Sequence, residues 1–164
     1  MKTVRYCTPE WFSESARLYQ ENASLQKELN KLSHKVSFKI KAEPVWGITR
    51  DVLFAFFILH GELTRLGFIR EDEAQIESEF ILTASPQEWK KILRGDAKFV
   101  TDFMLGKIVL EQGNRVTVLG VAPYSNAIIK ALTAVDLQFP DEMTSEEMQE
   151  YQHYHEQFRA ELDV

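Results

Sequence analysis

The sequence has one cysteine, no long apolar run and no clustered glycines, and each shortage excludes a class of protein. Among 164 residues only Cys7 is a cysteine, which excludes an intramolecular disulfide and a zinc-finger framework. No apolar segment reaches the roughly 20 residues that a membrane-spanning helix needs, and the N-terminus lacks the apolar run of a secretory signal. The 7 glycines are isolated, so there is no dinucleotide-binding or phosphate-binding loop. We therefore expect a cytoplasmic protein.

Positive charge is scarce at the C-terminal end. From Asp136 onward the chain holds nine acidic residues and one arginine, whereas the remainder carries a net +2 within the total of −6. Nucleic-acid binding requires a basic surface, because the ligand is a polyanion. We expect no nucleic-acid partner and interpret the acidic segment as a solvated helix face that aids solubility.

The first half of the chain predicts one helix followed by several strands. Thr8-Pro9 is a typical helix start, and apolar residues at helical spacing extend the predicted helix over residues 9–32. Residues 35–42 alternate between apolar and polar side chains, which indicates a half-exposed strand near a sheet edge. Residues 52–59, VLFAFFIL, predict a strand that is central or covered on both faces. We expect residues 71–73 to form a loop and residues 76–84 a further strand.

The second half contains clearer helix boundaries. Ser85-Pro86-Gln87-Glu88 matches a capping box and Gly95 a helix stop, so residues 86–94 form a short helix. A second short helix is expected over residues 97–105, then a strand over 107–112. VTVL, residues 116–119, predicts a strand or an extended connection, and an apolar helix follows Pro123. A second capping box, Thr144 to Glu147, starts an amphipathic C-terminal helix. This order of elements predicts an α+β fold.

The sequence contains no convincing catalytic group. His153 and His155 lie two residues apart on a predicted helix and point to different faces, unlike a pair of metal ligands. A nucleophile needs a base within hydrogen-bond distance, and pairing of Cys7 with a distant histidine stays open. The many C-terminal carboxylates look solvated, which makes them poor general acids. We expect no enzyme, no metal and no cofactor. A buried His60 would nevertheless be compatible with an enzyme that acts on an acyl or isoprenoid substrate, and this hypothesis is kept behind the two non-enzymatic ones given below.

The two short helices at 86–94 and 97–105 are rich in large apolar side chains, namely Trp89, Phe99, Phe103 and Met104. These residues either pack an ordinary core or form the roof of an apolar cavity over the sheet. Methionine beside aromatic residues suits an adaptable wall. Periodicity alone does not separate the two interpretations.

The order of motifs resembles that of the sterol carrier protein type 2 domain family. In that family a strand of the type ADVTLTGS enters a helix with an aromatic residue and a terminal glycine. Residues 80–85 (FILTAS), Trp89 and Gly95 match this pattern, and residues 104–108 (MLGKI) match the family's sGK(L/I) segment. The resemblance covers roughly residues 10–135. The segment GNRVTVLGVAP and the acidic helix after Thr144 depart from the family pattern.

The resemblance implies an α+β fold with about five mainly antiparallel strands and helices over one face, enclosing an apolar tunnel. We expect residues 1–140 to form this domain and 141–164 an acidic amphipathic helix that packs on the domain or on a partner subunit. The implied function is non-catalytic binding or transport of a fatty acid, acyl-CoA, sterol-like or isoprenoid lipid, with at most transient membrane contact. The wall residues predicted on this basis are Leu82, Trp89, Phe99, Phe103, Met104, Ile108, Ile128 and Leu132.

Two alternatives stay open at this point. One is an assembly module with a collapsed cavity, in which VLFAFFIL and the C-terminal helix serve subunit contacts such as a homodimer. The other is an accessory subunit that presents a lipid to an enzyme. We also expect the C-terminal helix to cover apolar surface on the far side of VLFAFFIL or at the tunnel mouth.

Overall fold

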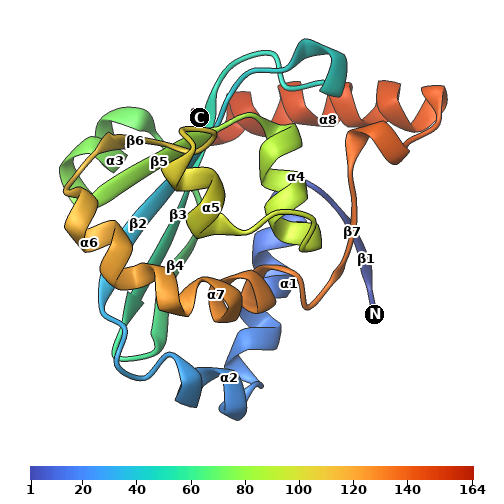
Figure 1. Ribbon diagram of the computed structural model, residues 1–164. Coiled ribbons are helices and arrows are strands. Elements are labelled where there is room, and N and C mark those ends of the chain that lie inside the picture. Colours follow the sequence, from blue (N-terminus) through green and yellow to red (C-terminus); the bar gives the residue numbers. More distant parts are fainter.

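The computed structural model describes residues 1–164 and contains a central five-stranded sheet (Figure 1). Neighbouring strands are antiparallel except for β2 and β5, which are parallel. In spatial order the strands are β4 (Glu62–Ile69), β3 (Val52–Leu59), β2 (His34–Ile40), β5 (Phe80–Ala84) and β6 (Val109–Gln112). The predicted α+β class with about five mainly antiparallel strands is confirmed.

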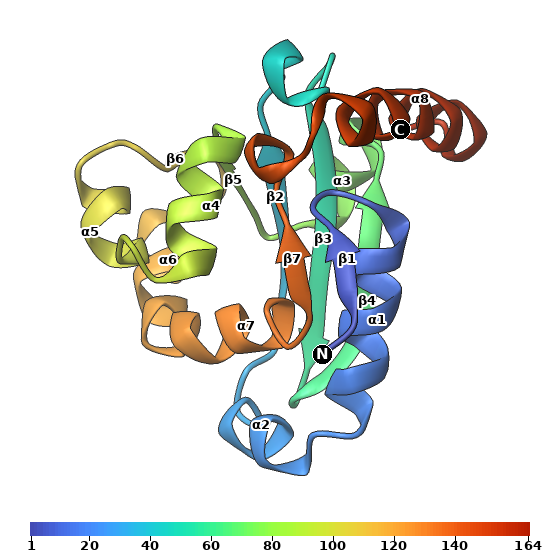
Figure 2. The ribbon, with the colours of Figure 1, turned by 90° about the vertical axis from the view of Figure 1, so that its right-hand side faces the viewer.

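Most of the helices lie on one side of the sheet (Figures 1 and 2). The α-helices are α1 (Pro9–Gln20), α2 (Ala23–Glu28), α3 (Glu71–Glu77), α4 (Pro86–Arg94), α5 (Phe99–Met104), α6 (Arg115–Val121), α7 (Ser125–Leu132) and α8 (Ser145–Leu162). Three single turns are 3₁₀: η1 (Pro44–Trp46), η2 (Ala122–Tyr124) and η3 (Pro140–Glu142). A separate parallel pair joins β1 (Thr3–Arg5) to β7 (Asp136–Gln138). None of these helices is both long enough and apolar enough to pass through a bilayer.

Strand β3 is buried on both faces, as its continuous apolar sequence predicts. Phe54 and Phe56 point into the large core under the helices, while Leu53 and Phe57 belong to a smaller cluster on the opposite face. The smaller cluster is covered by α3, whose Ala74 is fully buried. The cover is therefore α3 and not the C-terminal helix, which we expected either on this face or at the tunnel mouth.

Residues 71–73, expected as a loop, form the first turn of α3. Three acidic side chains at a helix N-terminus interact favourably with the helix dipole, so the acidic run suits this position. Ile76, which belongs to the strand expected over residues 76–84, lies on this helix and is 86% exposed. Strand β5 accordingly begins only at Phe80.

Three other predictions about local structure were wrong. The long N-terminal helix is divided at Asn22, whose side chain caps α2 by accepting a hydrogen bond from Leu25 N (3.0 Å). Residues 116–119 are helical in α6, where Asn114 caps the start. Strand β2 is central instead of near an edge, and Lys39 on it is buried with its Nζ bound to Glu71 (2.9 Å) and Glu111 (2.8 Å).

The C-terminal helix α8 packs on the body of its own chain. Its capping box is complete, with both the Thr144 and the Glu147 bonds formed. Tyr151 donates a hydrogen bond to the backbone oxygen of Tyr6 (2.5 Å), and Phe158 stacks on Phe68 with ring centroids 5.2 Å apart. The buried Arg159 donates to the backbone oxygens of residues 50 and 51. The apolar stripe of α8 therefore has an intramolecular partner.

Candidate functional site: an apolar pocket under the helices

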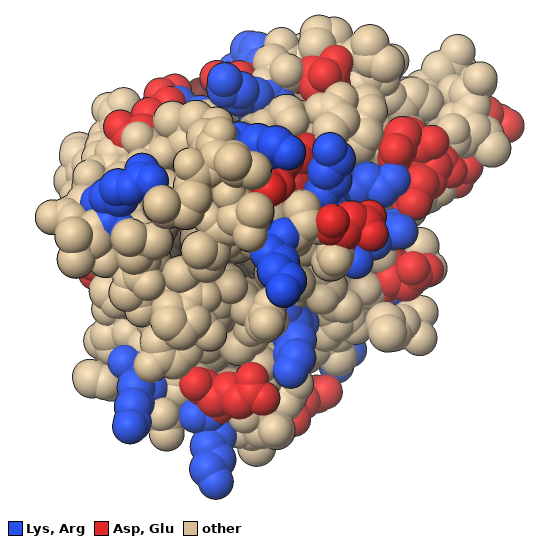
Figure 3. Space-filling model, viewed as in Figure 1, with Lys and Arg blue, Asp and Glu red and all other residues tan.

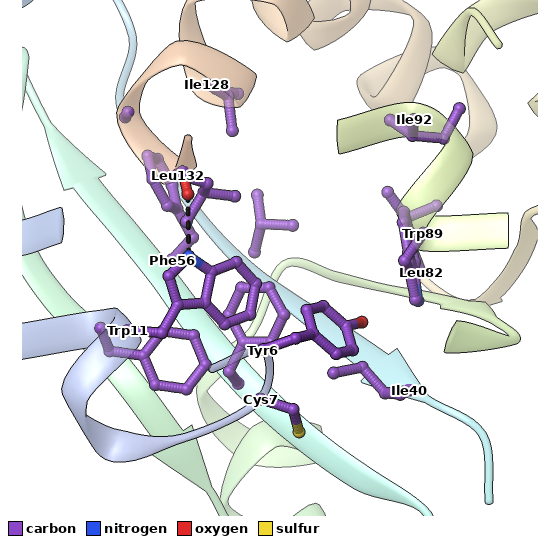
Figure 4. Close-up of a cluster of buried hydrophobic side chains, with 14 of the residues drawn as sticks. Tyr6, Cys7, Trp11, Ile40, Phe56, Leu82, Trp89, Ile92, Ile128 and Leu132 are labelled. Carbon is purple, nitrogen blue, oxygen red and sulfur yellow. Dashed lines mark hydrogen bonds between the residues drawn. The ribbon is translucent and has the colours of Figure 1, made fainter. Parts of the chain in front are cut away.

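An apolar pocket lies between the central sheet and the helices that cover it (Figure 4). Of its 19 lining residues 18 are hydrophobic, and its free volume is about 70 Å³. The lining residues are Tyr6, Trp11, Val36, Phe38, Phe54, Phe56, Phe80, Leu82, Trp89, Ile92, Leu93, Phe99, Val118, Val121, Ala122, Ser125, Ile128, Ile129 and Leu132. No charged residue contributes to the wall.

The floor of the pocket follows from strand alternation and register. Parallel pairing sets Val36 beside Phe80 and Phe38 beside Leu82, and antiparallel pairing sets Phe38 opposite Phe54. Because alternate residues of a strand share one face, all five side chains point toward the helices. The floor is therefore a continuous layer of phenylalanine, valine and leucine side chains.

The roof begins with α4, whose position is set by local sequence signals. Ser85 Oγ accepts a hydrogen bond from Glu88 N (3.1 Å), and Gly95 ends the helix with a φ of +76°. This frame directs Trp89 and Ile92 toward the sheet. Glu88 does not return to complete the expected capping box, because its carboxyl group is buried next to Asp102 of α5.

Two tryptophans of the wall join separate elements around the pocket through buried hydrogen bonds. Trp89 Nε1 donates to the backbone oxygen of Lys39 on β2 (3.0 Å). Trp11 Nε1 of α1 donates to the backbone oxygen of Leu132 on α7 (2.8 Å), the bond dashed in Figure 4. Each indole therefore satisfies its only polar atom and leaves the rest of its surface to the apolar wall.

Comparison with known proteins gives structural neighbours but no sequence match. No family model matches the chain, and no curated protein matches it. A crystal structure of sterol carrier protein 2 superposes with a TM-score of 0.62 and 19% identity, covering 79% of this chain and 95% of that one. A conserved hypothetical protein from Thermus thermophilus gives a TM-score of 0.68 and 18% identity, covering 80% and 90%. The chain has the sterol carrier protein 2 fold.

A third structure agrees with this assignment. The apo form of sterol carrier protein 2 from Yarrowia lipolytica gives a TM-score of 0.53 and 14% identity, covering 75% of this chain and 87% of that one. The fold inferred from residues 80–85, Trp89, Gly95 and residues 104–108 is thereby confirmed. Identities of this size establish the sterol carrier protein 2 fold and leave the ligand to be tested.

Five of the predicted wall residues line the pocket of this sterol carrier protein 2 fold. They are Leu82, Trp89, Phe99, Ile128 and Leu132. They come from β5, α4, α5 and α7, four elements that the resemblance placed around a tunnel. Their contact with a lipid stays a prediction.

The other three predicted wall residues lie outside the pocket. Phe103 is buried and stacks on Phe99 with ring centroids 5.8 Å apart, and Ile108 is buried as well. Met104 is 57% exposed, and its Sδ accepts a hydrogen bond from Arg115 (3.3 Å). Helix α5 has only six residues, so its inward face has room for few side chains, and Met104 points outward.

The sequence did not predict several lining residues, because they are distant in sequence from the other residues of the wall. Tyr6 and Trp11 come from the N-terminal segment, and Val118 comes from a helix that was expected to be extended. Phe54 and Phe56 could have been found, because they occupy alternate positions of a strand that was predicted correctly. No local pattern indicates that Tyr6 would reach the pocket.

The structure brings Cys7 and His155 into one buried cluster, but their protonation states do not suit catalysis. Burial raises the pKa of the Cys7 thiol to about 12 and lowers the pKa of His155 to about 4. Both side chains are therefore neutral at pH 7, whereas a cysteine nucleophile must be a thiolate. His60, considered as a buried catalytic group, is exposed at the turn between β3 and β4.

Proposed function

We propose that this protein is a non-catalytic lipid-binding protein that holds a fatty acid, acyl-CoA, sterol-like or isoprenoid lipid in the apolar pocket. The observation that carries the proposal is the wall itself, with 18 hydrophobic residues among 19 between the sheet and the helices. Burial of apolar surface is the main driving force for such binding, about 25 cal/mol per Å². The sterol carrier protein 2 fold supports the same conclusion.

A lipid must enlarge this pocket to enter it. The free volume is about 70 Å³, whereas small-molecule sites typically measure about 300–1,000 Å³. We expect α5 and α6 to move outward, because they are short helices outside the hydrogen-bond ladder of the sheet. Gly95 and Gly106, both at positive φ, lie in the segments before and after α5. The helix is therefore joined to its neighbours by a turn at each end.

The small free volume favours one alternative function. If the helices stay closed, the apolar residues are ordinary core and the protein acts as an assembly module. The two functions differ in whether the pocket accepts a ligand, so a binding experiment separates them.

The three tryptophans are natural reporters for that experiment. Trp11 and Trp89 line the pocket and Trp46 does not. A long-chain fatty acid with a nitroxide on its chain should quench the pocket tryptophans saturably and leave a residual emission from Trp46. In Trp46→Phe that residual emission should disappear.

A pair of variants tests the location of the ligand. Ile128→Phe fills the pocket and should abolish binding, whereas Leu119→Phe, on the exposed side of α6, should not. Native mass spectrometry of protein purified without detergent would count the bound lipid. Absence of saturable quenching across a panel of lipids, together with lipid-free native masses, would leave the assembly module as the function.

A further inference from the structure

One polar atom in the pocket wall has no partner within the protein. Tyr6 is buried, with 1% of the residue exposed, and its Oη makes no hydrogen bond. Five residues have such unpartnered buried side-chain atoms, namely Tyr6, Ser15, Thr83, Glu88 and His155, and of these only Tyr6 lines the pocket. Because buried polar groups in native proteins nearly always have a partner, this hydroxyl group requires an explanation.

The neighbours of Tyr6 hold its ring in one orientation. Its backbone N donates to Gln138 O (2.9 Å) at the end of the β1–β7 pair. The ring stacks on Phe139 and lies against Trp11, with ring centroids 4.8 Å and 5.1 Å away. Figure 4 shows the hydroxyl oxygen of Tyr6 pointing away from Trp11, to the side on which Trp89 lies. The donor is therefore positioned before a ligand arrives, which reduces the entropic cost of binding.

The rest of the wall offers a ligand no second buried and unpartnered polar side chain. The Nε1 atoms of Trp11 and Trp89 are already bonded, and Ser125, the one lining residue that is not hydrophobic, is only partly buried. No charged residue lines the pocket, and Figure 3 shows charged side chains at the outer surface of this side of the molecule. A buried water typically needs about two to four polar partners. A water bound to Tyr6 alone would therefore be poorly held.

The hydroxyl group of Tyr6 is a neutral donor. Burial, and to a lesser extent the neighbouring Cys7, raises the pKa of Tyr6 well above its ordinary value, so the phenol keeps its proton at neutral pH. One neutral hydrogen bond can satisfy a hydroxyl or carbonyl oxygen of a lipid. It does not compensate the burial of an ionised carboxylate, which requires a counter-charge and further hydrogen bonds. A fatty acid anion must therefore enter the pocket tail first and leave its carboxylate outside the wall.

We propose that Tyr6 Oη binds the oxygen of an uncharged lipid, such as a long-chain alcohol or ketone, whose polar end enters the pocket first. This inference rests on the proposed lipid-binding function and narrows it, because it separates uncharged lipids from fatty acid anions and acyl-CoA. Tyr6 is a specificity-determining residue in this role. It precedes residues 10–135, the stretch that resembles the sterol carrier protein type 2 family, so the resemblance does not imply this donor.

Replacement of Tyr6 by phenylalanine tests this role, because it removes the oxygen and keeps the ring. Decanol, decane and decanoate have the same chain length, and each can compete with the nitroxide fatty acid, so that its affinity follows from the loss of tryptophan quenching. Tyr6→Phe should weaken decanol about tenfold, the effect of one lost buried hydrogen bond, and leave decane unchanged. Decanoate, which is ionised at about pH 8, should also be unchanged. Equal weakening of decanol and decane, or of decanol and decanoate, would overturn the assignment.

Tyr19→Phe is the matched control. Tyr19 is also buried, but its Oη donates to Gly61 O (2.6 Å) and it does not line the pocket. Tyr19→Phe should lower the melting temperature of the lipid-free protein and leave the ratio of decanol to decane affinity unchanged. Tyr6→Phe should lower that ratio without lowering the melting temperature, because Tyr6 Oη has no partner in the lipid-free protein. A lower melting temperature with an unchanged ratio would indicate a structural role, such as a bond to a buried water, and would overturn the proposal.

Infrared spectroscopy detects the proposed hydrogen bond in the ligand itself. The carbonyl group of bound methyl nonyl ketone should absorb at a lower frequency in wild type than in Tyr6→Phe, because a donated hydrogen bond weakens the C=O bond. A purely structural role of Tyr6 would not shift this frequency. The same frequency in both proteins would refute contact between Tyr6 Oη and the ligand oxygen.

Failure of this inference can be told apart from failure of the lipid-binding proposal. Saturable binding of decanol, decane and the nitroxide fatty acid, with no selective effect of Tyr6→Phe on decanol, would refute the role of Tyr6 and leave the pocket as a lipid site. Absence of binding by all of these ligands would refute both.

Discussion

Replacement of Trp89 by alanine measures how much the pocket wall contributes to the fold. The indole is 7% exposed and its Nε1 donates to Lys39 O. Truncation of a buried tryptophan costs about 3–5 kcal/mol, from lost apolar burial and the cavity left behind. The backbone oxygen of Lys39 would also lose this partner, which is part of that cost.

Thermal unfolding followed by far-UV circular dichroism gives the effect directly. For a domain of this size 1 kcal/mol corresponds to about 2–4 °C, so Trp89→Ala should lower the melting temperature by about 6–20 °C. Trp89→Phe retains most of the apolar surface and loses the hydrogen bond, which should cost about 1–3 kcal/mol. The order of stability should therefore be wild type, phenylalanine, alanine.

Trp46 provides the control, since it is equally buried but lies outside the pocket. Trp46→Ala should also lower the free energy of unfolding by about 3–5 kcal/mol, without lowering the affinity for a fatty acid. Trp89→Ala should lower both stability and affinity. An unchanged melting curve for Trp89→Ala would contradict its burial, and unchanged lipid affinity would contradict its place in the binding wall.

Three further predictions concern other parts of the fold. Burial and the neighbouring Asp102 raise the pKa of Glu88 to about 7 from 4.5, so the protonated form is favoured in the folded state and stability falls as pH rises between these values. Glu88→Gln should remove this loss: measured by urea unfolding, its free energy of unfolding relative to wild type should be about 1–3 kcal/mol higher at pH 8 than at pH 5. The same difference between variant and wild type at both pH values would contradict the raised pKa. Gly113→Ala should destabilise more than Gly95→Ala, because an added Cβ would lie 2.5 Å from Phe80 Cβ at the first position and meets open space at the second; equal melting temperatures would be inconsistent with that contact. Deletion of residues 144–164 should increase binding of an apolar dye, since α8 buries Tyr151 and Phe158; unchanged dye binding and melting would show that α8 is a passive tail.

Short-range signals predicted the elements whose boundaries depend on local chemistry. Ser85, Pro86 and Gly95 define α4, and Thr144 with Glu147 starts α8 as expected. These signals work from sequence alone because a cap satisfies backbone groups within one turn of the helix. The burial of β3 could also be predicted from sequence alone, because a strand that is apolar on both faces requires a cover on each of them.

Elements with competing preferences were decided by tertiary packing. VTVL is rich in β-branched valine and threonine, which favour strands, yet Val118 and Val121 are buried from a helix. Lysines on β2 suggested an edge strand, whereas the structure surrounds β2 with β3 and β5 and neutralises Lys39 with carboxylates from two distant segments. Alternation identifies which residues share a face but not the position of the strand in the sheet.

The pocket wall contains both kinds of residue, those that local patterns predict and those that only tertiary packing brings there. Leu82, Trp89 and Ile128 could be assigned to an apolar wall from local periodicity and a family resemblance, because each lies on the buried face of its own element. Tyr6 and Trp11 reach the pocket only because β1 pairs with β7 and α1 packs against α7, contacts between opposite ends of the chain. Periodicity determined which side chains avoid water. Only the tertiary structure decided which of them meet, because contacts over such separations depend on how all the layers pack together.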